Sequence, residues 1–312
     1  MSGSAKYHLR LLWWVGLLLC CASASAHALT IDGERQLQYA DTLFNSRQYL
    51  RAGEEYQRFT FFFPDHPKVR TVRFRAAESF LLAKEVATAI DVLKPLTAQE
   101  PIDALSTEAF FLLAECYLQL NAPTHAIVQL NNIISLSDDI EVADRAYYRI
   151  GWIHIESADW RNAEKVFDRM SHKGRERHGL DQLRKALAGV EEIPTKSPAL
   201  SGTLSIIPGG GQLYCNRYED ALIAFALNAG FIWAAADAFD NEQYGLGGLL
   251  SFVGLGFYLG NIYGAVNDAH KYNQAQTGRF IDQLRRYQIR IPGPPQAAGS
   301  ARGLVLGLKI PF

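Results

Sequence analysis

The strongest constraint on the fold of this chain is a pattern of small residues that recurs every 37 residues. Each of four consecutive segments has one small residue near its start and a second one 12 residues later. The first set is Ala40, Ala77, Ala114 and Gly151, and the second set is Ala52, Ala89, Ala126 and Ala163. Chance rarely gives two such sets with one period, so the pattern predicts a repeat architecture.

The spacing within each segment predicts a pair of antiparallel helices. Short side chains are required where two helices approach closely, and bulky residues follow the second small residue at plus four and plus seven. The bulky residues are Tyr56, Leu93, Leu130 and Phe167, then Phe59, Leu96, Ile133 and Met170. Such a pair cannot bury its apolar face alone, so we expect eight helices in four stacked pairs over residues 34–172 and a polar capping helix over residues 175–189.

The segment AYYRIGWIHIESADWRNAEKVFDRM (residues 146–170) is the clearest unit. Its order of small, aromatic and bulky residues resembles the tetratricopeptide repeat, and Pro64 and Pro101 close the first two units as in that family. The common period of the family is about 34 residues, so each unit here is longer. The first unit also resembles repeats of exported bacterial envelope proteins, such as the periplasmic coordinator of the Tol–Pal system and the lipoprotein of the outer-membrane β-barrel assembly machinery. The resemblance implies a solenoid that binds protein or peptide partners.

The first 28 residues have the pattern of a secretory signal peptide. Lys6 and Arg10 flank the start of an apolar run at residues 11–21, and Ala26 and Ala28 follow with the spacing of a cleavage site. The run is too short to span a hydrocarbon layer about 30 Å thick. We therefore expect an exported protein of the bacterial cell envelope, cleaved after Ala28. Cleavage after Ala26 and an uncleaved anchor are the alternatives.

Two uncharged segments, residues 221–236 and 243–267, follow a proline-containing linker at residues 191–202. They predict a helical hairpin in or on a membrane, within a module of residues 203–290. Gly256, Gly260 and Gly264 recur every four residues, a stripe that lets helices pack closely in lipid. A tightly packed soluble helix pair is the alternative.

A glycine-rich segment precedes the first uncharged segment. Pro208 is followed by three glycines, which predicts a tight turn or a re-entrant loop. The pattern resembles a group of small two-helix bacterial membrane modules, and its motif residues are Pro208, Gly209, Gly211, Gln212 and Tyr214. It does not fit a phosphate-binding loop, because no Lys-Ser/Thr pair follows.

The C-terminal part is basic and then alternates in hydrophobicity. Phe280, Ile281 and Leu284 share a helix face beside two arginines, which suits either an anionic membrane surface or packing on the hairpin. Residues 291–312 form a tail in which residues 303–312 alternate strictly, so we expect a strand paired with residues 287–291. The expected fold is therefore all-α, a tetratricopeptide-like solenoid of four 37-residue repeats and a hydrophobic hairpin, with a short β tail.

The sequence predicts no catalytic chemistry. We find no histidine or cysteine pattern with metal-ligand spacing and no nucleophile elbow, so we expect no metal, no cofactor and no enzyme activity. Cys116 and Cys215, which would remain after cleavage, are expected as a buried thiol and a free thiol rather than a bridge. A net charge of −1 gives no basic footprint for nucleic acid.

The predicted function is that of a non-catalytic envelope adaptor. The repeat domain, residues 29–190, would bind a protein or peptide, and the hairpin at residues 221–267 would hold it at the membrane. Arg73, Tyr147 and Tyr148 are the candidate partner-binding residues, since arginine and tyrosine are favoured at interfaces; the alternative is that the tyrosines belong to the core. The alternative function is a membrane module that acts on a small solute or lipid, with the repeats as its regulator.

Overall fold

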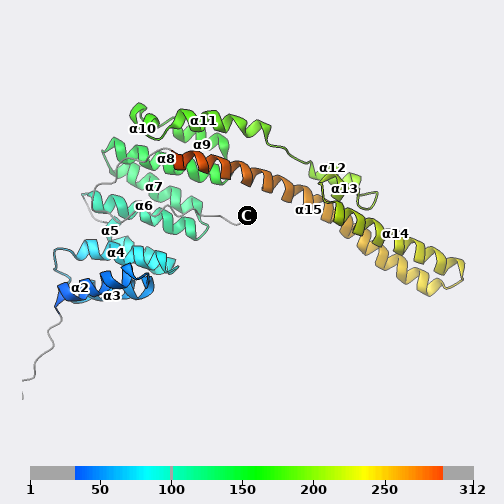
Figure 1. Cartoon of the computed structure of the whole chain (residues 1–312), viewed down its shortest axis with the longest axis horizontal. Coiled ribbons are helices and arrows are strands. Elements are labelled where there is room, and N and C mark those ends of the chain that lie inside the picture. The colour runs from blue at the N-terminus through cyan, green and yellow to red at the C-terminus, as the bar shows by residue number, and fades with distance from the viewer. Residues whose placement is uncertain (1–31, 99–100, 291–312) are drawn as a thin grey trace, which may run out of the picture. The chain divides into compact units, whose positions relative to one another are not determined.

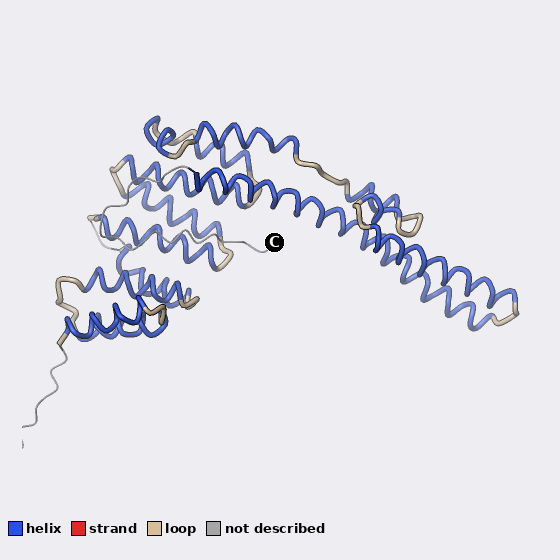
Figure 2. The backbone as a smooth tube through the Cα atoms, in the orientation of Figure 1, coloured by secondary structure: helices blue, strands red, loops and turns tan. Residues whose placement is uncertain are grey.

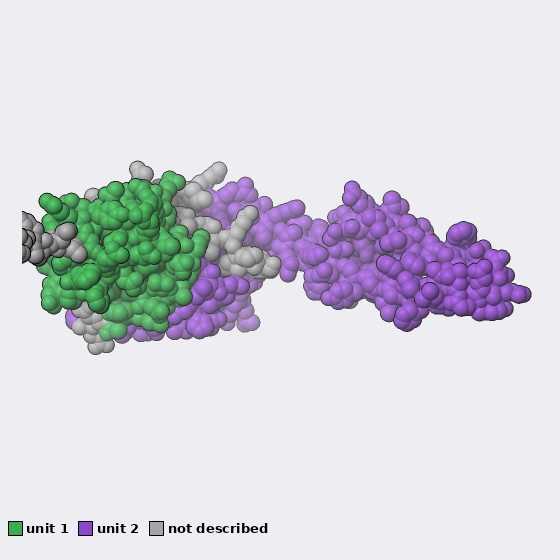
Figure 3. All heavy atoms as spheres, turned by 90° about the horizontal axis from the view of Figure 1, so that it is seen from below, with its two compact units in different colours: residues 1–99 green, residues 100–312 purple. Residues whose placement is uncertain are grey.

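The computed structural model describes residues 32–98 and 101–290, and these residues form helices and turns without a strand (Figures 1 and 2). The chain divides into two compact units, Met1–Gln99 and Glu100–Phe312 (Figure 3). The predicted signal peptide and the predicted terminal strand lie outside the described residues.

Unit 1 contains two helix pairs. Its helices are α2 (Gly33–Asn45), α3 (Tyr49–Phe62), α4 (Val69–Leu82) and α5 (Val86–Thr97). Each helix packs on the next one along the chain. The side chain of Asp32 begins α2 by accepting a hydrogen bond from the backbone N–H of Glu34 at 3.0 Å, a standard N-cap.

Unit 2 begins with two further helix pairs and ends with the predicted hairpin. Its elements are α6 (Ala104–Gln119), α7 (Pro123–Leu136), α8 (Ile140–Glu156), α9 (Trp160–Phe167), α10 (His172–Arg177), α11 (Leu180–Leu187), a 3-10 helix (Ala188–Glu192), α12 (Pro198–Leu204), α13 (Gly210–Tyr214), α14 (Tyr218–Asp240) and α15 (Tyr244–Arg290). The predicted capping helix is thus a pair of short helices, α10 and α11. Part of the predicted linker is helical, because α12 begins at Pro198.

The small residues of the repeat are buried in all four helix pairs. Each of the seven alanines is at most 1% exposed, and Gly151 is buried as well. A β-carbon at Gly151 would overlap the ring of Phe167, the bulky residue of the same pair. The eight bulky residues at plus four and plus seven are also buried. The period therefore marks the positions where the two helices of a pair meet.

The turn inside each helix pair has one residue in the left-handed backbone region. These residues are Arg47, Lys84, Asn121 and Ala158, with φ of 61°, 69°, 55° and 55°, and they lie 37 residues apart. The N–H of the following residue donates to a carbonyl five residues earlier, as in Gln48 to Leu43 at 2.9 Å and Asp159 to His154 at 2.8 Å. This is the Schellman motif, which satisfies the last carbonyl groups of the first helix. Sequence reasoning missed it because none of the four residues is glycine.

The C-terminal half of α15 packs on the repeat helices of unit 2 (Figure 1). Ile281 and Leu284 are buried in one apolar cluster with Trp152, Phe167 and Leu183. The predicted amphipathic face therefore covers neither a membrane surface nor the hairpin, and both interpretations were wrong. The physical reason is that α8, α9 and α11 leave an apolar face open at the end of the repeats, and α15 covers it.

Further contacts fix this position of α15. The ring of Phe280 meets that of Trp160 edge-on, with centroids 5.7 Å apart. Arg285 Nη2 donates to Glu156 Oε1 at 3.0 Å. The helix continues through residues 287–290, where we expected a strand, so that expectation was wrong. No proline occurs between Tyr244 and Arg290, so the helix is not interrupted there.

The left-handed turn residues give a stability prediction. Replacing Ala158 by glycine removes the β-carbon that disfavours this backbone region, so we expect stability to rise by about 1 kcal/mol. Ala143→Gly inside α8 is the control, and it should lower stability by about 0.5–1 kcal/mol. Thermal unfolding of the full chain in detergent, followed by circular dichroism, measures both. A lower midpoint for Ala158→Gly would contradict the turn geometry.

Candidate functional site

The predicted partner-binding residues lie in different units. Arg73 lies half-buried on α4 in unit 1, whereas Tyr147 and Tyr148 lie on α8 in unit 2. Both tyrosines pack against the apolar cluster that α15 completes. The Tyr148 ring also stacks on His178, with centroids 4.1 Å apart, and burial lowers the pKa of that histidine. The two tyrosines therefore contribute to core packing, as the alternative interpretation held.

Acid–base pairs connect the first helix of one pair to the first helix of the next. In unit 1, Asp41 Oδ1 accepts from Arg75 Nη1 at 2.7 Å, and Glu34 Oε1 accepts from Lys68 Nζ at 2.9 Å. In unit 2, Arg145 pairs with Glu108 through two hydrogen bonds and Arg149 pairs with Glu115. Sequence reasoning missed these pairs, although the signal was present, since each base follows its acid by 34 or 37 residues.

Arg145 of α8 contacts an aromatic ring as well as its acidic partner. Its guanidinium carbon lies 3.9 Å from the ring centroid of Phe111, a cation–π contact. Nearly half of its side chain remains exposed, and the same holds for Glu108. An exposed ion pair contributes only about 0–1 kcal/mol to stability, so a charged partner can replace it at small cost.

The glycine-rich motif forms a turn between α12 and α13 in which backbones touch. Gly209 has φ of +85°, and a β-carbon there would overlap the carbonyl oxygen of Ala221 on α14. A β-carbon at Gly211 would overlap the carbonyl oxygen of Ser201 and the hydroxyl of Ser205. Only glycine fits at both positions. The motif thus brings α12, α13 and α14 into backbone contact.

Serine hydroxyls satisfy the buried polar groups of this turn. Ser201 Oγ donates to the carbonyl oxygen of Ala265 on α15 at 2.7 Å. Ser205 Oγ accepts from the N–H of Gly211 at 3.2 Å and lies 3.1 Å from the carbonyl oxygen of Ser201. Both serines are fully buried. The side chain of Ser201 therefore attaches α12 to α15, whereas the side chain of Ser205, the C-cap of α12, holds the start of α13.

Asn261 of α15 makes the second half of the polar network. Its Oδ1 accepts from the N–H of Gly209 at 3.3 Å, and its Nδ2 donates to the carbonyl oxygen of Ser205 at 3.1 Å. Gln212 Nε2 donates to the backbone carbonyl of Asn261 at 3.1 Å. The side chain of Asn261 thus binds backbone groups on both sides of the turn. This role explains why a polar residue occurs within the uncharged part of α15.

Charged and aromatic residues surround the network on its side toward the repeats. The ammonium of Lys196 lies 4.5 Å from the ring centroid of Tyr214 and 5.6 Å from that of Tyr272. Asn273 binds both backbone groups of Lys196, at 2.7 and 2.9 Å. Arg217 Nη1 donates to Asp268 Oδ1 at 2.8 Å.

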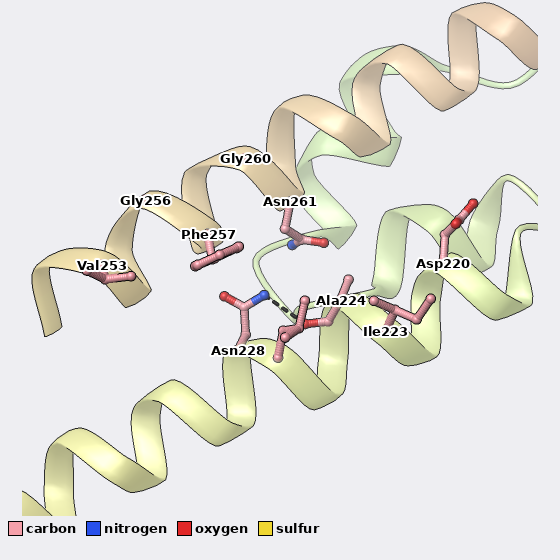
Figure 4. Close-up of a pocket in the computed structure, with 10 residues that line it drawn as sticks. Asp220, Ile223, Ala224, Asn228, Val253, Gly256, Phe257, Gly260 and Asn261 are labelled. Carbon is pink, nitrogen blue, oxygen red and sulfur yellow. Dashed lines mark hydrogen bonds between the residues drawn. The ribbon is translucent and has the colours of Figure 1, made fainter. Parts of the chain in front are cut away.

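A groove of about 460 Å³ runs between α14 and α15 (Figure 4). It is mostly apolar, with Asn228 and Asn261 as its amide groups. The side chain of Asn228 is only 4% exposed, and its Nδ2 donates to the carbonyl oxygen of Ala224 at 2.7 Å. Its Oδ1 points into the groove toward Phe257 (Figure 4).

The glycine stripe of α15 does not mediate packing on α14. A β-carbon at Gly256 or Gly260 would meet no atom within 4 Å, and one at Gly264 would meet only Gln212 Nε2 at 3.8 Å. The expected packing role inside the hairpin was therefore wrong. Gly256 and Gly260 line the groove instead, because the helix face that meets α14 passes through Gly254 and Phe257.

The two helices of the hairpin are long and apolar enough to cross a membrane. The candidate spans are Tyr218–Asp240 and Tyr244–Arg286, and only 17% and 11% of their apolar windows are buried. Both cysteines of the described residues are free and buried, and burial raises the pKa of the Cys116 thiol to about 12. Among the described residues, no group of histidine, cysteine and carboxylate side chains could hold a metal ion.

Comparisons of the chain with protein-family models, with curated proteins and with solved structures found no match.

The geometry of the turn gives a paired prediction for two glycines. Gly211→Ala inserts a methyl group between backbones that touch, so stability should fall by about 1–3 kcal/mol. Gly256→Ala places the same methyl group in open space and improves helix propensity, so stability should rise by up to about 1 kcal/mol. Thermal unfolding in detergent measures both variants, and equal midpoints would contradict the described turn.

Proposed function

We propose that the protein is a non-catalytic adaptor of the bacterial cell envelope, exported and held at a membrane by α14 and α15. Its tetratricopeptide-like repeats bind a protein or peptide partner. The observation that carries the proposal is the continuity of α15. One helix has an uncharged apolar first half and a second half that completes the core of the repeat helices in unit 2.

Support for the membrane anchor comes from the exposure of the hairpin. Trp233 on α14 is 73% exposed and Phe252 on α15 is 77% exposed, and large apolar side chains surround both. The helix core of a soluble protein would bury such residues, since water-soluble proteins rarely leave large apolar patches open. A lipid environment removes this cost. The alternative of a tightly packed soluble pair does not fit the exposure of these helices.

Support for a protein or peptide partner comes from the first helices of the repeats. Their exposed acid–base pairs can exchange with charges of a partner, and Arg145 over Phe111 offers an aromatic and a guanidinium group side by side. Arginine and aromatic residues supply much of the binding energy at protein interfaces. We therefore favour Arg145, Glu108 and Phe111 over Tyr147 and Tyr148 as partner-binding residues.

One experiment tests the anchor and the partner surface together. A photo-crosslinking residue at Glu108 should give a specific protein adduct in cells, whereas the same residue at Glu164, on the exposed face of α9, should not. Arg145→Glu should abolish the adduct. Alkaline carbonate washing should leave the chain in the membrane pellet. Release of a folded chain by carbonate would contradict the anchor, and equal adducts at both positions would contradict the partner surface.

The groove between α14 and α15 favours a second candidate function, a membrane module that binds a small solute or lipid. Asn228 Oδ1 offers a buried acceptor inside an apolar groove of a size that small ligands occupy. Gly256→Leu should fill the groove and remove a ligand that copurifies with the wild type, as measured by native mass spectrometry. Gly230→Leu, at an open position of α14, is the control. Equal ligand content in all three chains would exclude this candidate.

A further inference from the structure

We propose that α12, the glycine-rich turn and α13 form a re-entrant element that inserts into the membrane leaflet on the side of the repeats. Its outer face would contact lipid acyl chains. The inference rests on the proposed membrane hairpin, and it assigns the glycine motif a role that the adaptor function does not explain.

α12 and the glycine-rich turn lie along α15 in the direction of the hairpin tip. Four contacts follow one another antiparallel, from Lys196 on Asn273, through Ser201 on Ala265 and Ser205 on Asn261, to Ile206 on Tyr258. From Asp268 toward the hairpin tip, α15 contains no further charged residue. Tyr258 lies 10 residues beyond Asp268, which is roughly 15 Å along a helix. The turn therefore reaches about halfway into a hydrocarbon layer of about 30 Å.

The outer surface of the element is uncharged and largely apolar. Residues 197–216 contain no charged side chain, and Lys196 and Arg217 flank them. This stretch leads in and out again, so it is too short for two complete spans but long enough for a half-depth excursion. Its large apolar side chains point outward, and Ile206 and Ile207 at the tip are 61% and 70% exposed. A turn in water would favour polar residues at these positions.

The inner surface of the element supplies hydrogen-bond partners for the backbone of the turn. Non-helical backbone is tolerated at membrane depth only where protein satisfies its N–H and C=O groups. Ser205 and Asn261 accept from the N–H groups of Gly211 and Gly209, and Asn261 also donates to the carbonyl of Ser205. The polar network thus supplies what lipid cannot. An element with apolar residues outside and these backbone groups satisfied inside is suited to lipid, and Gln212 Oε1 is its one buried polar side-chain atom without a partner among the described residues.

Charged and aromatic residues lie at the boundary of the element toward the repeats. Lys196 lies against the rings of Tyr214 and Tyr272, and Arg217 pairs with Asp268. Lysine and tyrosine are the residues that mark the interface between hydrocarbon and water. All of them lie on the side of the element toward the repeats, at the level where the uncharged runs begin. They indicate the depth at which the leaflet surface meets the module.

Depth-dependent fluorescence quenching tests the proposal on the full chain. Single cysteines are placed at Ile207, at Phe252 in the hairpin and at Glu176 on α10, in a background with Cys20, Cys21, Cys116 and Cys215 replaced by alanine or serine. Each is labelled with a small environment-sensitive fluorophore and reconstituted into phosphatidylcholine vesicles. The quenchers are nitroxide groups on the acyl chains and aqueous iodide. Ile206→Cys serves as a second tip position, in case one label disturbs the turn.

We expect labels at Ile207 and Phe252 to be quenched several-fold more by the acyl-chain nitroxide than the label at Glu176, and iodide to quench only the last. If Phe252 is quenched by lipid while both tip positions behave like Glu176, the re-entrant element is wrong and the membrane hairpin stands. If Phe252 also behaves like Glu176, the proposed anchor itself fails, and the re-entrant element with it.

Discussion

The burial of Ile281 and Leu284 against α8, α9 and α11 is the interaction on which unit 2 depends. Repeat helices leave an apolar face at the end of a stack, and a terminal element must cover it. Here the cover is the far end of a helix whose first half is apolar throughout. The contact of Phe280 with Trp160 and the ion pair of Arg285 with Glu156 fix the rotation of that helix. Core packing and the orientation of the hairpin are thus set by the same few side chains.

The glycine-rich turn determines how α12, α13 and α14 are placed against one another and against α15. Gly209 and Gly211 permit backbone contact with α14 and α12, and Asn261 holds the turn against α15. Arg217 at the N-cap of α14 pairs with Asp268 of α15 as well. The buried polar network gives α12 and α13 a defined register on α15. The motif is therefore a structural connector between α12, α13 and the two helices of the hairpin.

Much of the fold could be predicted from the sequence, because the 37-residue period marks positions where helices pack against each other. Close helix contact requires small residues at positions such as Ala52 and Ala126, and small residues can be recognised directly in the sequence. The left-handed residues Arg47 and Lys84 share the same period, yet they could not be predicted, because these residue types carry no preference for that backbone region. The helix pairs could thus be predicted from the sequence, whereas the backbone conformation of the turns could not.

The site was harder to predict than the fold, since it depends on contacts distant in sequence. The pattern of Gly256 and Gly260 indicates close packing, but only the rotation of α15 shows that these residues face a groove. The charge pattern near Arg285 suits a membrane surface as well as Glu156, 129 residues earlier. Periodicity identifies an apolar face, and it does not identify what covers that face.

Through its two halves, α15 joins the hairpin and the repeat helices of unit 2 into one body. Spin labels at Glu164 on α9 and at Glu242 in the hairpin loop, measured by pulsed dipolar spectroscopy in detergent, test it directly. We predict one narrow distance distribution, which broadens when Leu284 is replaced by aspartate. A broad distribution in the otherwise unchanged chain would contradict it.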